Sequence, residues 1–187
     1  KGVAPTGQLL EYRGALALPL RDTGGTLHSL QFISPDGSKR FLTGGRIAGC
    51  FFPLADKADG PLVVCEGYAT SASIFEATGV ATVATMNCGN LPAVAKVLRA
   101  KWSQREIILA ADNDQWTAGN PGLTKATEAA KATGAKLAVP SFPDTGSKPT
   151  DFNDLARLVS RAEVRRQIEA AAAPAETDEE LLNRLAA

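Results

Sequence analysis

The sequence predicts an α/β protein in which helices flank a parallel sheet and a small β-rich subdomain precedes that sheet. Two patterns carry this prediction. Residues 14–52 consist of short strand-like stretches separated by turn sequences. From residue 61 onward, short runs that are apolar throughout alternate with stretches of helical periodicity, which is typical of a parallel sheet covered on both faces.

The β-rich region is expected to be a meander of three strands. The first strand covers residues 15–20, and the turn sequence RDTGGT separates it from a second strand at residues 27–34. A second turn, PDG, leads to a third strand at residues 39–43. Residues 44–54 follow as an irregular exit toward the parallel sheet.

The parallel sheet is expected to contain four strands, at residues 61–67, 80–88, 106–112 and 136–142. Helical stretches separate these strands. The first covers residues 70–79, and the second begins at an Asn90 cap. The third covers residues 122–133 and ends at Gly134, a residue type that favours the end of a helix.

The rest of the chain is expected to be helical. Residues 143–160 form a loop that enters a helix, and residues 160–173 carry a capping box from Ser160 to Glu163. A last amphipathic helix covers residues 177–187, with a second capping box at its start. We therefore divide the chain into a β-rich N-terminal subdomain at residues 1–58, the α/β domain at residues 59–160 and a helical extension at residues 161–187.

Composition and charge exclude several classes of protein. Lys plus Arg equals Asp plus Glu, at 20 each, so a nucleic-acid surface would have to come from local clusters. No apolar run approaches the ~20 residues of a membrane span. The first residues contain neither an initiator Met nor a signal peptide. We expect a piece of a longer cytoplasmic protein with no membrane partner.

Cysteine and histidine are not spaced closely enough for a structural zinc site. Cys50, Cys65 and Cys88 form no CxxC pair, and His28 is the single histidine. The cysteines are expected to be reduced and at least partly buried. A lone histidine with no visible partner acid also disfavours a Ser/His/Asp hydrolase.

Acidic residues follow three of the predicted strands. They are Glu66 at the carboxyl end of the first strand, Asp112 and Asp114 at the end of the third, and Asp151 and Asp154 after the fourth. Ligands of open α/β sheets bind beyond the carboxyl ends of the strands. If the strands are neighbours, all these carboxylates gather at one edge of the sheet.

Carboxylates crowded at one edge require either a cation or shifted pKa values. Oxygen ligands without histidine or thiolate suit Mg²⁺ or Mn²⁺, which leave coordination positions for substrate phosphates. The set therefore predicts metal-assisted phosphoryl or nucleotidyl transfer. Simpler explanations stay open: Asp151 and Asp154 as helix caps, the Asp112–Asp114 pair as an Asx turn, and Glu66 as a solvated carboxylate.

The joint pattern resembles the Toprim domain, the catalytic core shared by bacterial-type primases, type IA and type II topoisomerases and some nucleases. The matching segments are VVCEGYATSASI with Glu66, ILAADND with Asp112 and Asp114, and PTDFNDLA with Asp151 and Asp154. Within that family the chain is similar to phage-type and plasmid-type DNA primases, in which the primase is often fused to a helicase or mobilisation protein. The β-rich region is similar to the segment that precedes Toprim in those primases.

The resemblance implies a DNA primase, a nucleotidyltransferase of DNA replication that synthesises short RNA primers from NTPs on a single-stranded DNA template. Glu66 would act as general acid/base or metal ligand, and Asp112 with Asp114 would bind the divalent cation. Asp151, with Asp154 or Asn153 nearby, would complete a second metal position. Zinc-binding and helicase or mobilisation modules are expected in the full-length protein. Two departures stand out: Thr70 occupies a position where many replicative primases carry an acid, and this chain contains no zinc-binding module.

Template binding needs Lys or Arg against phosphates. The expected nucleic-acid contacts are Lys39, Arg40 and Arg46 on the meander and Lys148 just before the last acids. An ordinary charged hairpin is the alternative for the first three.

Two other functions are compatible with the same sequence. A Toprim nuclease would use the acids to direct water at a phosphodiester, but the primase-like meander argues against it. A degenerate Toprim module would bind nucleic acid without catalysis, and Thr70 and the absent zinc module favour it. A topoisomerase is disfavoured because neither Tyr12 nor Tyr68 has the required context.

Overall fold

The structure, a computed structural model, describes residues 2–3, 9–10, 13–55 and 59–176, with side chains from residue 13 onward. The strands are β1 (Gly2–Val3), β2 (Leu9–Leu10), β3 (Leu16–Arg21), β4 (Leu27–Ile33), β5 (Lys39–Phe41), β6 (Phe52–Pro53), β7 (Leu62–Cys65), β8 (Ala81–Ala84), β9 (Ile107–Ala110) and β10 (Lys136–Ala138). The helices are α1 (Tyr68–Thr78), α2 (Leu91–Lys101), α3 (Pro121–Thr133), α4 (Phe152–Leu158) and α5 (Arg161–Glu169), with a 3-10 turn η1 (Cys88–Asn90) before α2. None of the helices among the described residues could span a membrane.

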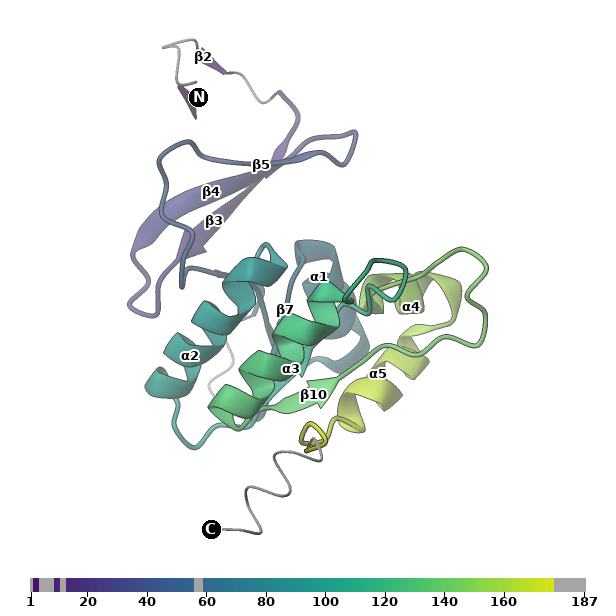
Figure 1. Cartoon of the computed structure of the whole chain (residues 1–187). Coiled ribbons are helices and arrows are strands. Elements are labelled where there is room, and N and C mark those ends of the chain that lie inside the picture. The colour runs from purple at the N-terminus through teal and green to yellow at the C-terminus, as the bar shows by residue number, and fades with distance from the viewer. Residues whose placement is uncertain (1, 4–8, 11–12, 56–58, 177–187) are drawn as a thin grey trace.

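The predicted β-rich region is confirmed as an antiparallel meander in the order β3-β4-β5. It stands beside the larger domain, as Figure 1 shows. Gly25 and Gly37, in the two turns of the meander, both have positive φ. Glycine adopts this backbone conformation without the steric cost that other residues pay. An isolated bridge from Arg21 to Phe51 joins the meander to the chain that enters the second sheet.

The second sheet has the order β10-β9-β7-β8-β6, in which the first four strands are parallel and β6 pairs antiparallel with β8. Every residue of β7, β8 and β9 is buried, which confirms that these apolar runs are covered on both faces. The α/β fold class expected from the sequence is therefore correct. The antiparallel edge strand β6 was not expected, because it lies within the stretch assigned to an irregular exit.

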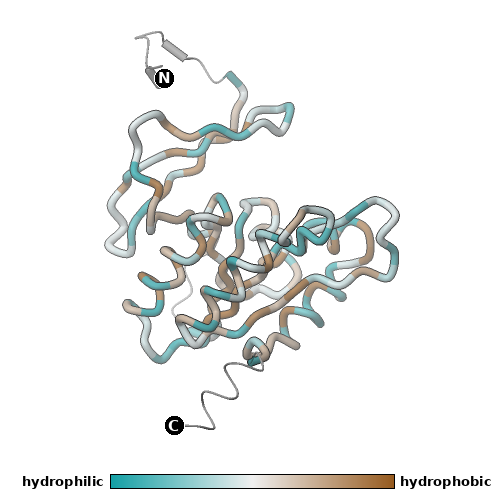
Figure 2. Tube along the Cα trace, viewed as in Figure 1, coloured by the Kyte–Doolittle hydropathy of each residue, from teal (hydrophilic) through white to brown (hydrophobic). Residues whose placement is uncertain are grey.

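Helices cover the two faces of the sheet in separate layers (Figure 1). On one face α2 and α3 pack through residues such as Leu98 and Ala129 against Val64 and Leu109. On the other face α1, α4 and α5 pack against Val63 and Ile108. Figure 2 shows hydrophobic residues along the central strands and hydrophilic ones along the outer loops. Alternate residues of the same strand therefore pack into two different hydrophobic cores, one on each face of the sheet.

Several element ends differ from the sequence prediction. Strand β8 ends at Ala84, short of residue 88, because the chain turns at Met86 with φ 73° and enters η1. Strand β10 ends at Ala138, two residues before Pro140, which has no N–H to donate to a neighbouring strand. The helix predicted at residues 177–187 lies outside the described residues.

Asn90 does not cap α2 with its side chain, which corrects the sequence prediction. Its amide nitrogen instead donates to the Cys50 carbonyl (2.8 Å) and the Thr85 carbonyl (2.9 Å), and its oxygen accepts from Gly49 N (2.9 Å). The buried side chain therefore ties the exit from the meander to the parallel sheet. Satisfying three backbone groups in the interior outweighs one cap at a helix end.

The three cysteines are free, as expected; Cys50 and Cys65 are buried and Cys88 is partly buried. His28 is partly buried and bonds Asp22 through Nε2 (2.7 Å). Ser160 caps α5 by accepting from Glu163 N (3.1 Å), so that half of the predicted capping box is present. The Glu163 carboxylate bonds Arg166 and Gln167 instead of completing the box.

Candidate catalytic site

Four of the five predicted acids lie together beyond the carboxyl ends of neighbouring strands. Strands β7 and β9 pair in parallel with Cys65 opposite Ala110, so Glu66 and Asp112 start from adjacent strand ends. Asp114 follows two residues later, and Asp151 forms the N-cap of α4. The charges of Glu66, Asp151 and Asp114 all raise the pKa of Asp112, which places these groups within electrostatic range of one another.

Asp112 is the most perturbed of these acids. Burial, followed by the neighbouring carboxylates, raises its pKa to about 8, and Lys39 opposes the shift. Its Oδ1 atom is buried and has no hydrogen-bond partner among the described residues. An unpaired buried carboxylate oxygen is costly, so this atom is a natural acceptor for a proton or a cation.

Glu66 is partly buried beside Asp112. Burial raises its pKa, the charge of Asp114 adds to the shift, and Lys39 on β5 acts in the opposite direction. A carboxylate with a raised pKa is a better proton acceptor than an ordinary one. Glu66, where the strand ends before a glycine, is therefore a partly buried carboxylate that lies near other carboxylates.

Asp114 is held by the start of α3. Its Oδ2 atom accepts a hydrogen bond from Gly122 N (3.0 Å), where free N–H groups of the first turn favour negative charge. Gly122 is buried, and a Cβ there would lie 2.6 Å from the Asp112 carbonyl oxygen and 2.8 Å from Asp114 Oδ2. Only glycine therefore allows α3 to approach the two aspartates this closely.

Asp151 and Asp154 act as capping residues of α4. Asp151 Oδ1 accepts from Asp154 N (2.7 Å), and Asp154 Oδ2 accepts from Thr150 N (3.0 Å). The second Asp151 oxygen, Oδ2, accepts from the Thr70 hydroxyl (2.8 Å). Asp151 still faces the acid cluster, whereas the Asp154 carboxylate is turned to the loop that precedes the helix.

The acids suit a hard divalent cation, although they do not form a ready-made cage. Among the residues that the structure describes, no three His, Cys, Asp or Glu side chains converge as a set of metal ligands. Magnesium is usually held by one or two carboxylates and completed by waters and substrate phosphates. The unpartnered Asp112 oxygen among other carboxylates fits that kind of site.

The predicted basic residues are not all near the acids. Lys39 is exposed on β5, and its charge lowers the pKa of both Glu66 and Asp112. Arg40, also exposed, follows it, and its charge acts on Asp36 in the hairpin turn. Lys148 is exposed on the loop before α4, in a left-handed backbone conformation with φ 55°. Of the four predicted basic residues, Lys39 is therefore the one whose charge acts on the site carboxylates.

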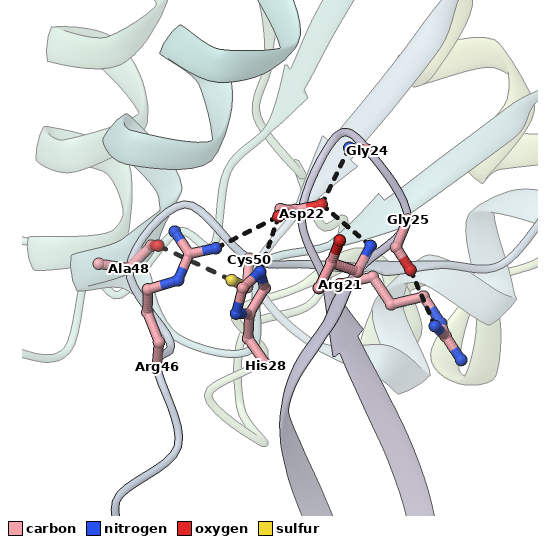
Figure 3. Close-up of polar contacts among 9 residues, drawn as sticks. Arg21, Asp22, Gly24, Gly25, His28, Arg46, Ala48 and Cys50 are labelled. Carbon is pink, nitrogen blue, oxygen red and sulfur yellow. Dashed lines mark hydrogen bonds and ion pairs between the residues drawn. The ribbon is translucent and has the colours of Figure 1, made fainter.

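Arg46 lies in a different cluster, which Figure 3 shows. Its guanidinium pairs with Asp22 Oδ2 (3.4 Å), which also bonds His28 (2.7 Å). Asp22 Oδ1 accepts from Gly24 N and Thr26 N, so the carboxylate shapes the β3–β4 turn. The hydrogen bond from His28 is the main reason that the pKa of Asp22 is lowered. The cluster fixes the turn against residues 44–50.

Two residues support the site in ways that the sequence pattern did not predict. Thr70 appeared as a departure from the family pattern, yet it is buried and bonds Asp151. Gly122 was expected as the first residue of a helix, whereas its close approach to both aspartates was not expected. The sequence feature that could have revealed this role is a glycine just inside the start of a helix. Glycine destabilises a helix there, so its presence suggests that another backbone comes close. Tyr68 packs edge-to-face on Phe52, with ring centroids 5.8 Å apart.

Comparison with known proteins identifies the family. Residues 61–162, more than half of the chain, match the model of the Toprim domain. The chain belongs to the Toprim family, and the predicted resemblance is confirmed.

Two similar relatives are DNA primases named TraC from Escherichia coli. One is 44% identical over 144 residues, which covers 72% of this chain and 14% of that protein. The other is 41% identical over 163 residues, which covers 81% of this chain and 11% of that protein. This chain therefore spans about a seventh or less of the length of these relatives.

Solved primase structures share the fold. A DNA primase domain from Pseudomonas aeruginosa superposes with a TM-score of 0.65 at 18% identity, covering 93% of this chain and 56% of that one. The zinc-binding and RNA polymerase domains of the Aquifex aeolicus primase give a TM-score of 0.65 at 19% identity, covering 91% and 44%. The primase fragment of the bacteriophage T7 primase-helicase protein gives 0.61 at 18%, covering 81% and 62%.

Proposed function

We propose that this chain is the catalytic part of a DNA primase, which joins ribonucleotides into short RNA primers on single-stranded DNA with Mg²⁺ or Mn²⁺. The observation that carries the proposal is the buried Asp112 oxygen without a partner in a cluster of carboxylates. Relatives named DNA primase at 41% and 44% identity favour this reaction among those of the Toprim family.

Asp112 and Asp114 would hold the divalent cation, and Asp151 would contribute to a second position. When bound, the cation would lower the pKa of the attacking hydroxyl and neutralise charge that develops on the phosphates. The hydrogen bond from Gly122 N fixes one Asp114 oxygen and leaves the other for a ligand. Asp154 would act on the site through the cap of α4.

Glu66 would take the proton from the 3′-hydroxyl of the growing primer. The freed oxygen attacks the α-phosphorus of the incoming NTP, the new O3′–P bond forms, and the bond to pyrophosphate breaks. The raised pKa of Glu66 makes it a stronger base than an ordinary glutamate, which suits a proton acceptor. Lys39, across from Glu66, would offset negative charge on the phosphates.

The proposed function also implies contacts with a DNA template and further modules in the full-length protein. Lys39, Arg40 and Lys148 would contact template phosphates, and Arg46 would contribute only when released from Asp22. A reaction that uses NTPs and single-stranded DNA would take place in the cytoplasm. Zinc-binding and helicase or mobilisation modules would accompany this domain in the full-length protein.

Primer synthesis tests the proposal. The domain, joined to its native neighbours, is incubated with single-stranded DNA, NTPs and Mg²⁺ or Mn²⁺. We expect short RNA products that disappear in Glu66→Gln and Asp112→Asn. Glu128→Gln is the matched control, because Glu128 is an exposed acid on α3 that pairs only with a surface lysine, Lys125, among the ion pairs described. Products that persist in both site variants would contradict the proposal.

A non-catalytic module is the second candidate. Asp151 and Asp154 serve as helix caps, and a hydroxyl at Thr70 stands where many primases carry an acid. Such a module would bind single-stranded DNA and yield no products under any metal condition. Metal-dependent nicking of DNA without NTPs would instead indicate a Toprim nuclease.

A further inference from the structure

Trp116 is an exposed aromatic side chain beside the carboxylate cluster. It lies two residues after Asp114, and 44% of its surface is exposed. All other aromatic side chains within residues 13–55 and 59–176 are buried or partly buried. A tryptophan normally contributes much of its large surface to a core, so its exposure here calls for a partner.

The loop that carries Trp116 is held in place on both sides. Thr117 N donates to the Asp114 carbonyl (2.8 Å), and Asn120 N donates to the Thr117 carbonyl (3.0 Å). The indole N–H of Trp116 points to the Pro149 carbonyl (3.4 Å), on the loop that leads to Asp151. The polar edge of the ring is thus occupied, while a large part of its apolar surface faces solvent.

Other exposed hydrophobic side chains do not share this setting. Leu16 and Leu27 lie on the meander, and Leu158 and Val159 lie at the end of α4. Scattered aliphatic residues of this kind are ordinary on a protein surface. Trp116 differs because it follows Asp114 by two residues and bonds Pro149, which lies between the exposed Lys148 and the site residue Asp151 in the sequence.

These features match the parts of a nucleotide. A flat aromatic ring stacks on any base, a lysine meets a phosphate, and carboxylates hold the cation that binds phosphates. We propose that Trp116 is a stacking platform for a nucleobase held next to the carboxylate cluster, with Lys148 as a phosphate contact. This inference rests on the proposed function and says which residues bind the base and the phosphate of a nucleotide.

Tryptophan fluorescence tests the stacking directly. The chain contains only two tryptophans, Trp102 and Trp116. Trp102 lies at the opposite end of the sheet, after α2, next to Lys101 and Arg105. The Trp102→Phe variant therefore leaves Trp116 as the single reporter. Titration with a single-stranded oligodeoxynucleotide and, separately, with ATP and Mg²⁺ shows whether a template base or a nucleotide base stacks.

We expect saturable quenching of Trp116 in one of the two titrations. Calorimetric titration, which does not depend on the Trp116 signal, should show that Trp116→Ala binds that ligand about 5- to 150-fold more weakly, while the affinity of Trp116→Phe, which keeps a ring, should stay within about 3-fold of wild type. Leu158→Ala is the control, because it removes an exposed apolar side chain from another surface. Lys148→Gln should weaken binding and reduce its salt dependence.

Two results would overturn the inference: a Trp116 signal that neither ligand changes, or equal affinity of wild type and Trp116→Ala for both. The proposed function is tested separately by primer synthesis. Wild-type primer synthesis with unchanged Trp116→Ala binding would reject stacking alone. Trp116-dependent binding in a protein that makes no primers would reject the primase and keep the stacking site.

Discussion

The Thr70 hydroxyl donates a hydrogen bond of 2.8 Å to Asp151 Oδ2, across 81 residues of sequence. Thr70 is buried on α1, and Asp151 starts α4, so the bond fixes two helices on the same face of the sheet. A second bond, from Ser73 Oγ to Asn153 Oδ1 (3.0 Å), runs parallel to it. A neutral hydroxyl thus orients a site carboxylate without adding charge.

We predict that Thr70→Val, which keeps the shape of the side chain, destabilises the domain by about 1–3 kcal/mol, because one Asp151 oxygen loses its donor. Primer synthesis should fall more than stability alone explains, since Asp151 becomes free to turn. Thermal unfolding and primer assays check both effects. Thr70→Ser should restore most of each, and an equally active Thr70→Val would show that the orientation of Asp151 is unimportant.

The raised pKa of Asp112 predicts a dependence of stability on pH in metal-free protein. The folded state holds the proton up to a pKa of about 8, while the unfolded chain releases it near the ordinary value of 3.8. The stabilisation that protonated Asp112 contributes to the folded state is therefore fully present below pH 3.8. It declines as the pH rises and is lost as the pH passes through 8. Asp112→Asn has no carboxyl group to titrate at this position. The stability of the variant relative to wild type should therefore increase from pH 5 to pH 8.5.

Thermal unfolding with EDTA measures this effect. At pH 8.5 we expect Asp112→Asn to melt higher than wild type by ~4–8 °C, which corresponds to about 2 kcal/mol in a domain of this size. Near pH 4 the two proteins should melt alike. Parallel melting curves across the whole range would show that Asp112 is not perturbed.

Gly122→Ala should destabilise the protein, although alanine usually favours a helix. The added Cβ would meet the Asp112 carbonyl oxygen at 2.6 Å, so either α3 or the two aspartates must move. Overpacking of this kind costs about 1–3 kcal/mol, more than the helix gains from alanine. Chemical denaturation measures the cost. Gly146→Ala is the control, because its Cβ would meet only the Asp144 side chain, at 3.3 Å on an exposed loop.

Lys39→Gln should shift the pH profile of primer synthesis. Lys39 lowers the pKa of Glu66, so the variant should raise that pKa further. The acidic limb of the profile then moves to higher pH, and the loss of rate at pH 6.5 exceeds the loss at pH 8.5. Arg46→Gln removes a cation that pairs with Asp22 and should leave the limb in place. Identical shifts in both variants would mean a general loss of positive charge.

Local patterns made much of the fold predictable. Strands β7, β8 and β9 follow from short apolar runs because both faces of each strand are buried. The helix ends at Gly79 and Gly134 follow from glycine, since both adopt left-handed backbone conformations there. The position of the acids at one edge follows from the direction of parallel strands.

Contacts between distant segments could not be derived in this way. Asn90 is a fair helix cap by sequence, but its role depends on Cys50, Thr85 and Gly49 coming together around it. The pairing of Arg46 with Asp22 depends on the fold of the meander exit, which carries no regular pattern. The Thr70–Asp151 bond likewise appears only once α1 and α4 are packed.

Calorimetric titration of Mn²⁺ into wild type and an Asp112→Asn/Asp114→Asn double variant, each with and without ATP, tests whether the carboxyl edge of the sheet holds a divalent cation. We expect wild type to bind the cation, with ATP strengthening the binding, and the double variant to lose it while Glu128→Gln behaves as wild type. Equal binding by wild type and double variant, or no binding by wild type even with ATP, would contradict a cation site at the carboxyl edge of the sheet.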